Sequence, residues 1–243
     1  PNAAADVFAA VAALNKRSGA AAAAETVSVD VLVNNAGAAW SAPFVDTPAD
    51  KVSSMLALNI EAATQLAHLF LPGMIQRKQG RVLNISSISA LAPAPSQAVY
   101  VATKAYLLRW SETLSHEMLP HGVGVMCLLP GATATGFQEA AGASFFVNQL
   151  KLCVQEPTAV AAAATHTILQ RGWRSPVSVP GVFNKVLYWV TPSFSFTVWL
   201  LNLGSGLMWG RQIRSFRDLR AVLASAVLPS ACSKSSAQAP NSR

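Results

Sequence analysis

Val29-Asp30-Val31-Leu32-Val33-Asn34-Asn35-Ala36-Gly37 is the stretch that decides the fold. A short apolar run that ends in Asn and Gly predicts a buried strand entering a loop, because Asn satisfies free backbone groups and Gly tolerates unusual backbone angles. Further strands are predicted at 81–87, 123–129 and 175–179, with an alanine-rich helix at 3–17 and another helix near 157–170. Strands that alternate with helices of this length predict a parallel, doubly wound α/β sheet.

A further helix is predicted between the first two strands. Thr47-Pro48-Ala49-Asp50 has the pattern of a helix start, with Thr47 as N-cap and Pro48 in the first turn. The pattern runs towards Leu71, and Pro72-Gly73 is expected to interrupt it.

Composition limits the class of protein. The chain has 243 residues and is 52% hydrophobic, which is enough for one substantial core. Its three cysteines contain no Cys-x-x-Cys pair, so neither a disulfide framework nor a thiolate metal site is expected, and an intracellular, reducing compartment fits. The net charge is +7, but residues 211–243 hold six of the basic residues against one acidic residue. A basic nucleic-acid surface over the whole molecule is therefore not expected.

Tyr100 and Lys104 are the first candidate functional residues. The run 100–104 is predicted to be helical, and residues four apart lie on the same helical face. A lysine ammonium beside a phenol stabilises the phenolate, so the pair predicts a tyrosine with a lowered pKa that acts as general acid/base. A Tyr-x-x-x-Lys pair alone is a weak signal.

The neighbouring motifs make the signal specific. Asn35 is followed after 24 positions by Asn59, Asn59 after 28 by Ser87, and Ser87 after 13 by Tyr100. Pro130-Gly131 then follows the third predicted strand. In order and spacing, residues 1–180 resemble the short-chain dehydrogenase/reductase family. The resemblance implies a Rossmann-like sheet and an oxidoreductase that uses NAD or NADP.

The resemblance also assigns roles to individual residues. Tyr100 would exchange a proton with the substrate oxygen, Ser87 would hydrogen-bond that oxygen, and Asn59 would anchor a water in a proton relay through Lys104. The implied cofactor-binding residues, with no metal site among them, are Asn35, Ala36, Gly37, Tyr100, Lys104, Pro130, Gly131, Thr133 and Thr135. Read alone, Asn59 would be an ordinary polar helix residue, Ser87 a turn former, and Asn35 and Gly37 loop-shaping residues.

One part of the family pattern is missing. The glycine-rich turn that holds the dinucleotide pyrophosphate should precede Asn34, but Gly19 is the only glycine upstream. We therefore expect a Rossmann-like sheet that lacks its first strands, from an N-terminally truncated record. The position that distinguishes NAD from NADP lies in the missing part.

The chain divides into three predicted regions: a partial Rossmann-type domain at 1–181, an apolar helical extension at 182–228 and a disordered basic tail at 229–243. No charged residue occurs in 186–210, whereas 211–228 has the pattern of a basic amphipathic helix. Three interpretations of 186–228 stay open: a hydrophobic flap on the domain or on a partner subunit, an anchor on a membrane surface, and a membrane span.

Two functional hypotheses follow. The first is an NAD(P)-dependent enzyme that interconverts a hydroxyl and a carbonyl on a hydrophobic small molecule, which Phe137, Phe145 and Phe146 and the apolar extension favour. The second is a non-catalytic module that docks on a membrane or partner through the extension. The family resemblance also implies a homo-oligomer, paired through the helices that carry Asn59 and Tyr100.

Overall fold

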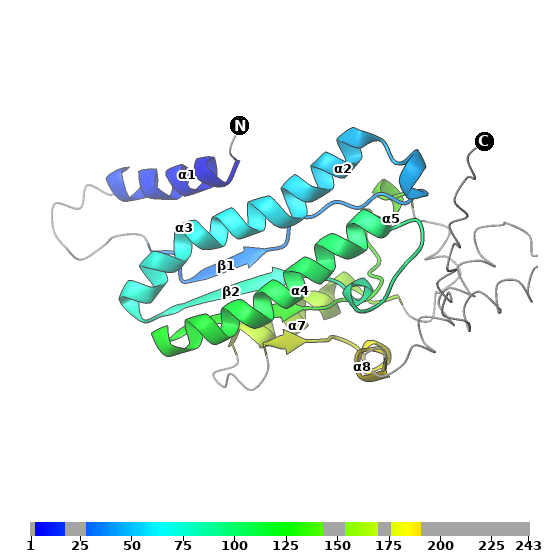
Figure 1. The fold of residues 1–243 in the computed structure, drawn as a ribbon. Helices are drawn as coiled ribbons and strands as arrows, with labels where there is room; N and C mark the ends of the chain where they lie inside the picture. The colour runs from blue at the N-terminus through cyan, green and yellow to red at the C-terminus, as the bar shows by residue number, and fades with distance from the viewer. Residues whose placement is uncertain (1–2, 18–27, 143–153, 170–175, 191–243) are drawn as a thin grey trace, which may run out of the picture.

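A computed structural model describes residues 3–17, 28–142, 154–169 and 176–190. Figure 1 shows helices packed around a small sheet. The helices and turns are α1 (Ala3–Arg17), η1 (Phe44–Asp46), α2 (Ala49–Leu56), η2 (Ala57–Glu61), α3 (Ala62–Arg77), η3 (Ile88–Leu91), α4 (Ala98–Met118), η4 (Leu119–His121), α5 (Phe137–Ala140), α7 (Pro157–Leu169) and α8 (Val182–Val190). The strands are β1 (Val31–Asn34), β2 (Gly80–Ile85), β3 (Val123–Leu128) and β4 (Val177–Ser178).

The four strands form one parallel sheet in the order β1-β2-β3-β4. Because all four run in the same direction, the loops that follow β1, β2 and β3 meet at one edge of the sheet. Asn34 pairs with Asn84, and Asn84 pairs with Cys127, so these three residues form a row near that edge. The predicted α/β class with a parallel sheet is confirmed.

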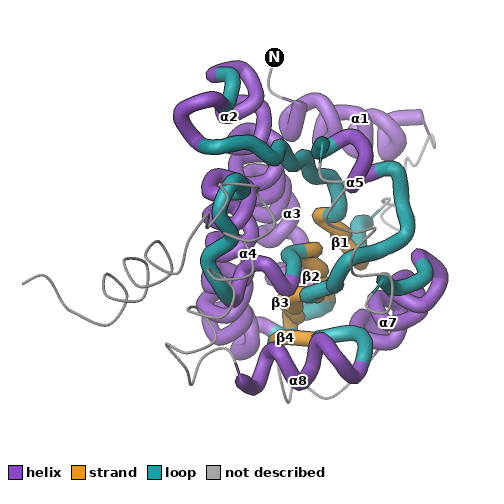
Figure 2. The backbone as a smooth tube through the Cα atoms, turned by 90° about the vertical axis from the view of Figure 1, so that its right-hand side faces the viewer, coloured by secondary structure: helices purple, strands orange, loops and turns teal. Residues whose placement is uncertain are grey.

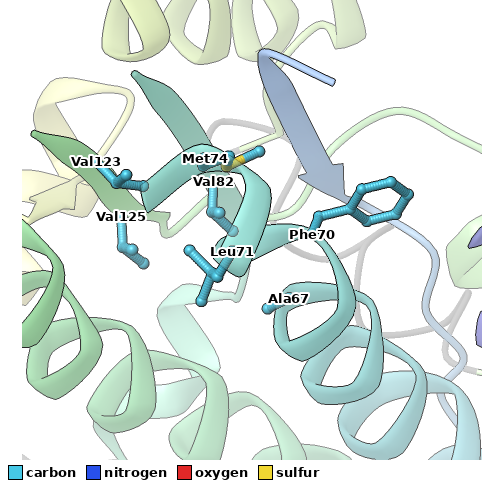
Figure 3. Packing of buried hydrophobic residues seen from close by; sticks show 7 residues of the cluster. All are labelled: Ala67, Phe70, Leu71, Met74, Val82, Val123 and Val125. Atoms are coloured by element: carbon cyan, nitrogen blue, oxygen red, sulfur yellow. The ribbon is translucent and has the colours of Figure 1, made fainter. Parts of the chain in front are cut away.

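The core is divided between the two faces of the sheet. On one face, α3 packs on Val82, Val123 and Val125, with α4 beside it (Figure 3). On the other face, Leu83 and Met126 pack against α7. Successive strand residues point to opposite faces, so the apolar runs of β2 and β3 are buried on both sides, as a parallel sheet requires. Figure 2 shows α3 and α4 on one side of the strands and α7 on the other.

Strand β1 differs from its prediction. We expected a buried strand, but Val31 and Val33 are 41% and 46% exposed. Leu32 points the other way and packs against the α3 side of the core. These valines are exposed because α7, the helix on that face of the sheet, packs on β2 and β3 rather than on β1. Within the part of the chain that the structure describes, β1 is also an edge strand.

The helix between β1 and β2 differs from its prediction at both ends. Thr47 is not the N-cap: its Oγ1 donates to the Pro43 carbonyl at 3.1 Å, and the helix begins at Ala49. Pro72 does not interrupt α3, which continues to Arg77. Leu71 and Met74 are both buried on either side of the proline, and this packing outweighs the helix-breaking tendency of Pro72.

The C-terminal region is described only in part. Residues 182–190 of the predicted extension form α8, whereas 191–243 lie outside the described residues, as do Phe145 and Phe146. Among the helices that the structure describes, none combines the length and the apolar character needed to cross a membrane. The division at 181 and 228 stays a prediction.

Candidate active site

The candidate site lies where β1, β2 and β3 end, the edge at which open α/β sheets bind ligands. Asn35, Ala36 and Gly37 follow β1, Ser87 follows β2, and Pro130-Gly131 follows β3. Helix α4 brings Tyr100 and Lys104 to the same region from one face of the sheet.

Tyr100 is buried and makes a side-chain hydrogen bond with Ser87. The Ser87 oxygen also accepts from the Ser89 backbone N–H at 3.1 Å. Burial raises the pKa of Tyr100 above its ordinary value of 10.0, and the hydrogen bond from Ser87 offsets part of this rise. The pKa of Tyr100 is therefore raised rather than lowered as expected, because burial outweighs the effect of Ser87. Lys104 is not among the causes of this shift, and its role toward Tyr100 stays a prediction.

Lys104 is only 4% exposed. Its ammonium donates to the Ile85 carbonyl at 2.9 Å, at the end of β2, and lies 5.8 Å from the centre of the Tyr100 ring. Burial lowers the pKa of Lys104 to about 8, and interaction with Cys127 counteracts a smaller part of this effect. The Lys104 side chain thus changes its charge near physiological pH.

Gly37 fits between two of the predicted catalytic residues. A Cβ atom at this position would lie 3.3 Å from the Asn59 Oδ1 and 3.3 Å from the Lys104 Nζ. The glycine therefore allows a close approach that a side chain would make tight, and it has no unusual backbone angle. Asn35 and Ala36 are exposed beside it.

Asn59 is fully buried in η2, a widened π-type turn between α2 and α3. Its side chain joins two segments: Oδ1 accepts from the Ala38 N–H at 2.8 Å, while Nδ2 donates to the Ala38 carbonyl and to Thr103 Oγ1, both at 2.9 Å. Both amide hydrogens are therefore used inside the protein. A water in the predicted relay would have to hydrogen-bond to other atoms of Asn59. Widened turns of the π type, such as η2, often occur at functional sites.

Thr103 is a residue that the sequence reasoning missed. It is fully buried, accepts from Asn59 and donates to the Tyr100 carbonyl at 2.8 Å. Its position three residues after Tyr100, on the same helical face, was the available signal.

The loop after β3 is held by local and long-range hydrogen bonds. The Pro130 carbonyl accepts from the Ile88 N–H at 2.9 Å, next to Ser87. Thr133 donates to the Gly131 carbonyl at 3.1 Å, and Thr135 accepts from the Phe137 N–H at the start of α5. The ring of Phe137 then lies 6.0 Å from that of Tyr100, centre to centre.

The structure thus brings Gly37, Asn59, Ser87, Tyr100 and Lys104 into one connected group. Asn35 and Ala36 flank it on the exposed side, and Pro130, Gly131, Thr133 and Thr135 form a neighbouring loop. Their functional roles stay predictions.

The sequence model of the short chain dehydrogenase family matches residues 3–144. The chain belongs to this family. The resemblance recognised from the motif spacing is therefore confirmed, and so is the Rossmann-like fold.

The alignments with individual relatives cover only part of each relative's length. A very-long-chain 3-oxoacyl-CoA reductase of Laccaria bicolor is 41% identical over 102 residues, which is 41% of this chain and 30% of the relative. A human protein named inactive hydroxysteroid dehydrogenase-like protein 1 is 35% identical over 142 residues, 58% of this chain and 42% of the relative. The chain thus spans well under half of these relatives. Since one of them is named inactive, family membership does not decide activity.

Solved structures support the fold. A short-chain dehydrogenase from Sphingobium yanoikuyae, solved in complex with NADPH, has a TM-score of 0.60 and 27% identity, covering 86% of this chain and 72% of that one. A short-chain dehydrogenase from Streptomyces avermitilis has a TM-score of 0.63 at 24% identity, covering 86% of this chain and 77% of that one.

Proposed function

We propose that the protein is an NAD(P)-dependent oxidoreductase that interconverts a hydroxyl and a carbonyl on a hydrophobic small molecule. The observation that carries the proposal is the buried Tyr100, hydrogen-bonded to Ser87 and lying beside Lys104 at the carboxyl edge of a parallel sheet. A bound nicotinamide dinucleotide would supply or accept the hydride, and the protein side chains would manage the proton and the charge.

The raised pKa of Tyr100 sets its protonation state at neutral pH. A phenol with a pKa above 10.0 is protonated at neutral pH, so Tyr100 is prepared to donate a proton to a carbonyl oxygen. Ser87 would hydrogen-bond the same oxygen as negative charge develops on it. The protonated phenol is the form that donates the proton when a carbonyl is reduced, and the phenolate would accept it in the reverse reaction.

The residues fit the nicotinamide half of a dinucleotide better than its pyrophosphate half. Gly37 leaves open the space that a Cβ would fill next to Lys104, whose ammonium would hold ribose hydroxyls. Pro130, Gly131, Thr133 and Thr135 would approach the carboxamide, and Asn35 and Ala36 would border the cleft. Both NAD and NADP are candidates, since one structure of this fold holds NADPH and another holds NAD.

The substrate is proposed to be a long-chain 3-oxoacyl thioester or a similar lipid-like ketone. Phe137, whose ring lies against that of Tyr100, provides an apolar wall for the substrate. Several relatives are named very-long-chain 3-oxoacyl-CoA reductases.

The test is a matched pair of substitutions in the longest reading frame that contains this chain. Tyr100→Phe removes only the proton-donating hydroxyl, and we expect a loss of about 10²–10⁴-fold in kcat. Tyr106→Phe is the control, because Tyr106 lies on the same helix and its hydroxyl contacts Thr64 on the surface instead. Oxidation of NADPH and NADH is followed by absorbance with a long-chain 3-oxoacyl-CoA. Equal rates for Tyr100→Phe and wild type would remove the proposed role of Tyr100.

A second candidate function is docking on a lipid surface through α8. Val182, Phe183, Val186 and Trp189 are exposed along this helix, with Val182 at 79% and Trp189 at 76%. Their spacing places them near one face of the helix. In the sequence, the uncharged stretch 186–210 begins within α8, and the basic pattern at 211–228 follows it.

Vesicle co-sedimentation tests the docking function. The double variant Phe183→Ser/Trp189→Ser should lose most of its binding to vesicles with anionic lipid, whereas Val45→Ser, at an exposed valine of η1, should not. Equal binding by both variants would exclude α8 as the lipid-binding face. No binding of the wild type to these vesicles would exclude lipid docking and favour a protein partner for this face of α8.

We further propose a homo-oligomer in an intracellular, reducing compartment. Tyr106 stacks on Trp110 on the outer side of α4, and Leu58 on the neighbouring η2 is 38% exposed. A charge at Tyr106 (Tyr106→Glu) should shift the sedimentation coefficient towards that of a monomer. An unchanged coefficient would exclude this face.

A further inference from the structure

Gln155 stands outside the site and holds the backbone of the loop after β3. Its N–H donates to the Ala132 carbonyl at 2.8 Å, and its carbonyl accepts from the Ala134 N–H at 2.9 Å. This is a short parallel bridge opposite Thr133. The two hydrogen bonds fix the middle of the loop that carries Thr133 and Thr135.

The side chain of Gln155 extends the same contact to α8. Its Oε1 accepts from the Gly131 N–H at 3.2 Å and from Asn184 Nδ2 at 3.1 Å. Asn184 is 4% exposed and also donates to the Pro180 carbonyl at 2.9 Å. A single acceptor oxygen therefore joins Gly131, near the start of the loop, to the first turn of α8.

Packing around this contact leaves no room for larger residues. A Cβ at Gly131 would lie 2.5 Å from Asn184 Nδ2, and a Cβ at Gly181 would lie 2.6 Å from Gln155 Nε2. Gly181 also has a φ of +85°, which a side chain would strain. Two glycines thus allow the two amide side chains to enter between the loop and α8.

The loop is connected on its other side to Ser87. The Pro130 carbonyl accepts from the Ile88 N–H at 2.9 Å, one residue beyond Ser87. The loop therefore spans from the Ser87 segment to α8, and Gln155 holds its centre. Figure 2 shows α8 beside β4, at the end of the molecule away from α1.

We propose that Gln155 and Asn184 are positioning residues, which fix the loop 130–135 for the nicotinamide half of a dinucleotide and couple it to α8. The catalytic consequence rests on the proposed function, whereas the mechanical consequence does not. Whatever binds the apolar outer face of α8 would act on the loop through Asn184 on its inner face.

The first experiment measures the loop itself in the 243-residue chain. Gln155→Leu removes the acceptor oxygen but keeps both backbone hydrogen bonds. Amide hydrogen exchange at Gly131 should rise roughly tenfold, the factor that corresponds to the loss of one hydrogen bond. Exchange at Val82 and Val125 in the core strands should stay unchanged, because the fold remains intact.

Two further variants serve as controls. Gln155→Glu keeps an acceptor oxygen in place and should restore protection at Gly131. Gln65→Leu makes the same change on α3, where Gln65 donates only to Glu61, and should leave Gly131 unaffected. Unchanged exchange at Gly131 in Gln155→Leu would overturn the proposed contact.

The second experiment measures the coupling in the longest reading frame that contains this chain. Gln155→Leu and Asn184→Leu should each raise the KM for NADPH or NADH about three- to tenfold, with a smaller change in kcat. The double variant should be no worse than the more severe single variant, because both residues act through one oxygen. Wild-type KM values in an active enzyme would overturn the positioning role. If the wild type shows no turnover, the proposed function fails, and the exchange experiment alone decides the contact between the loop and α8.

Discussion

Replacing the buried lysine of the site should change how stability depends on pH. Folding lowers the pKa of Lys104 from its ordinary 10.5 to about 8 because burial disfavours the ammonium. Between these two pH values the unfolded chain binds more protons than the folded chain. The free energy of unfolding therefore rises with pH across this window. Lys104→Met removes the titrating group and, with it, this contribution.

The size of the effect follows from the shift. At about 1.36 kcal/mol per pKa unit, burying the ammonium costs about 3 kcal/mol well below pH 8. About 1 kcal/mol of this cost should disappear between pH 7 and pH 9. Burial also raises the pKa of the Cys127 thiol to about 12, but both proteins contain this cysteine. Lys104 lowers the pKa of this thiol to a small extent, but the buried thiol stays protonated between pH 7 and pH 9 in both folded proteins, so its effect cancels over this range.

Urea unfolding at pH 7, 8 and 9, followed by circular dichroism, measures the difference directly. Relative to Lys104→Met, the wild type should gain about 1 kcal/mol of stability over this range. Lys185→Met is the matched control, because Lys185 is exposed on α8 and its removal should change stability equally at each pH. A constant difference between wild type and Lys104→Met would refute the burial argument.

Three substitutions test other parts of the site and core. Asn59→Leu should lower the free energy of unfolding by about 2–4 kcal/mol, because it removes three hydrogen bonds, two to the half-buried backbone of Ala38 and one to the buried Thr103 hydroxyl; a loss below about 0.5 kcal/mol would contradict the three hydrogen bonds. Gly37→Val should cost about 1–3 kcal/mol by crowding the site, and equal midpoints in urea would show that the site has spare room. Gly80→Ala should cost a similar amount, about 1–3 kcal/mol, because its Cβ would collide with the Met74 side chain. A thermal midpoint equal to that of wild type would contradict the packing at Gly80.

Local patterns were sufficient for the elements whose neighbours are close in sequence. The helix expected at 3–17 is α1, and the helix expected near 157–170 is α7. Tyr100 and Lys104 share a helical face because residues four apart must do so. The predicted strands are parallel, and the predicted site residues follow their ends, so the sequence predicts a site at one edge of the sheet.

Properties that depend on tertiary contacts were not predictable. The exposure of Val31 and Val33 depends on where α7 packs, and the continuation of α3 past Pro72 depends on buried side chains around it. The direction of the Tyr100 pKa shift depends on how deeply the ring is buried, which spacing does not give. The hydrogen bond between Gln155 and Asn184 joins residues 29 positions apart, and no sequence motif marks either of them.

The central claim is that this site transfers a hydride to a carbonyl while Tyr100 supplies the proton. The most direct measurement uses nicotinamide cofactor deuterated at the transferring carbon, with a long-chain 3-oxoacyl-CoA and the longest reading frame that contains this chain. Mass spectrometry of the product should show one deuterium on the new carbinol carbon with wild type, and a yield about 10²-fold or more lower with Tyr100→Phe. Product without deuterium, or equal deuterium yields from wild type and Tyr100→Phe, would contradict the claim.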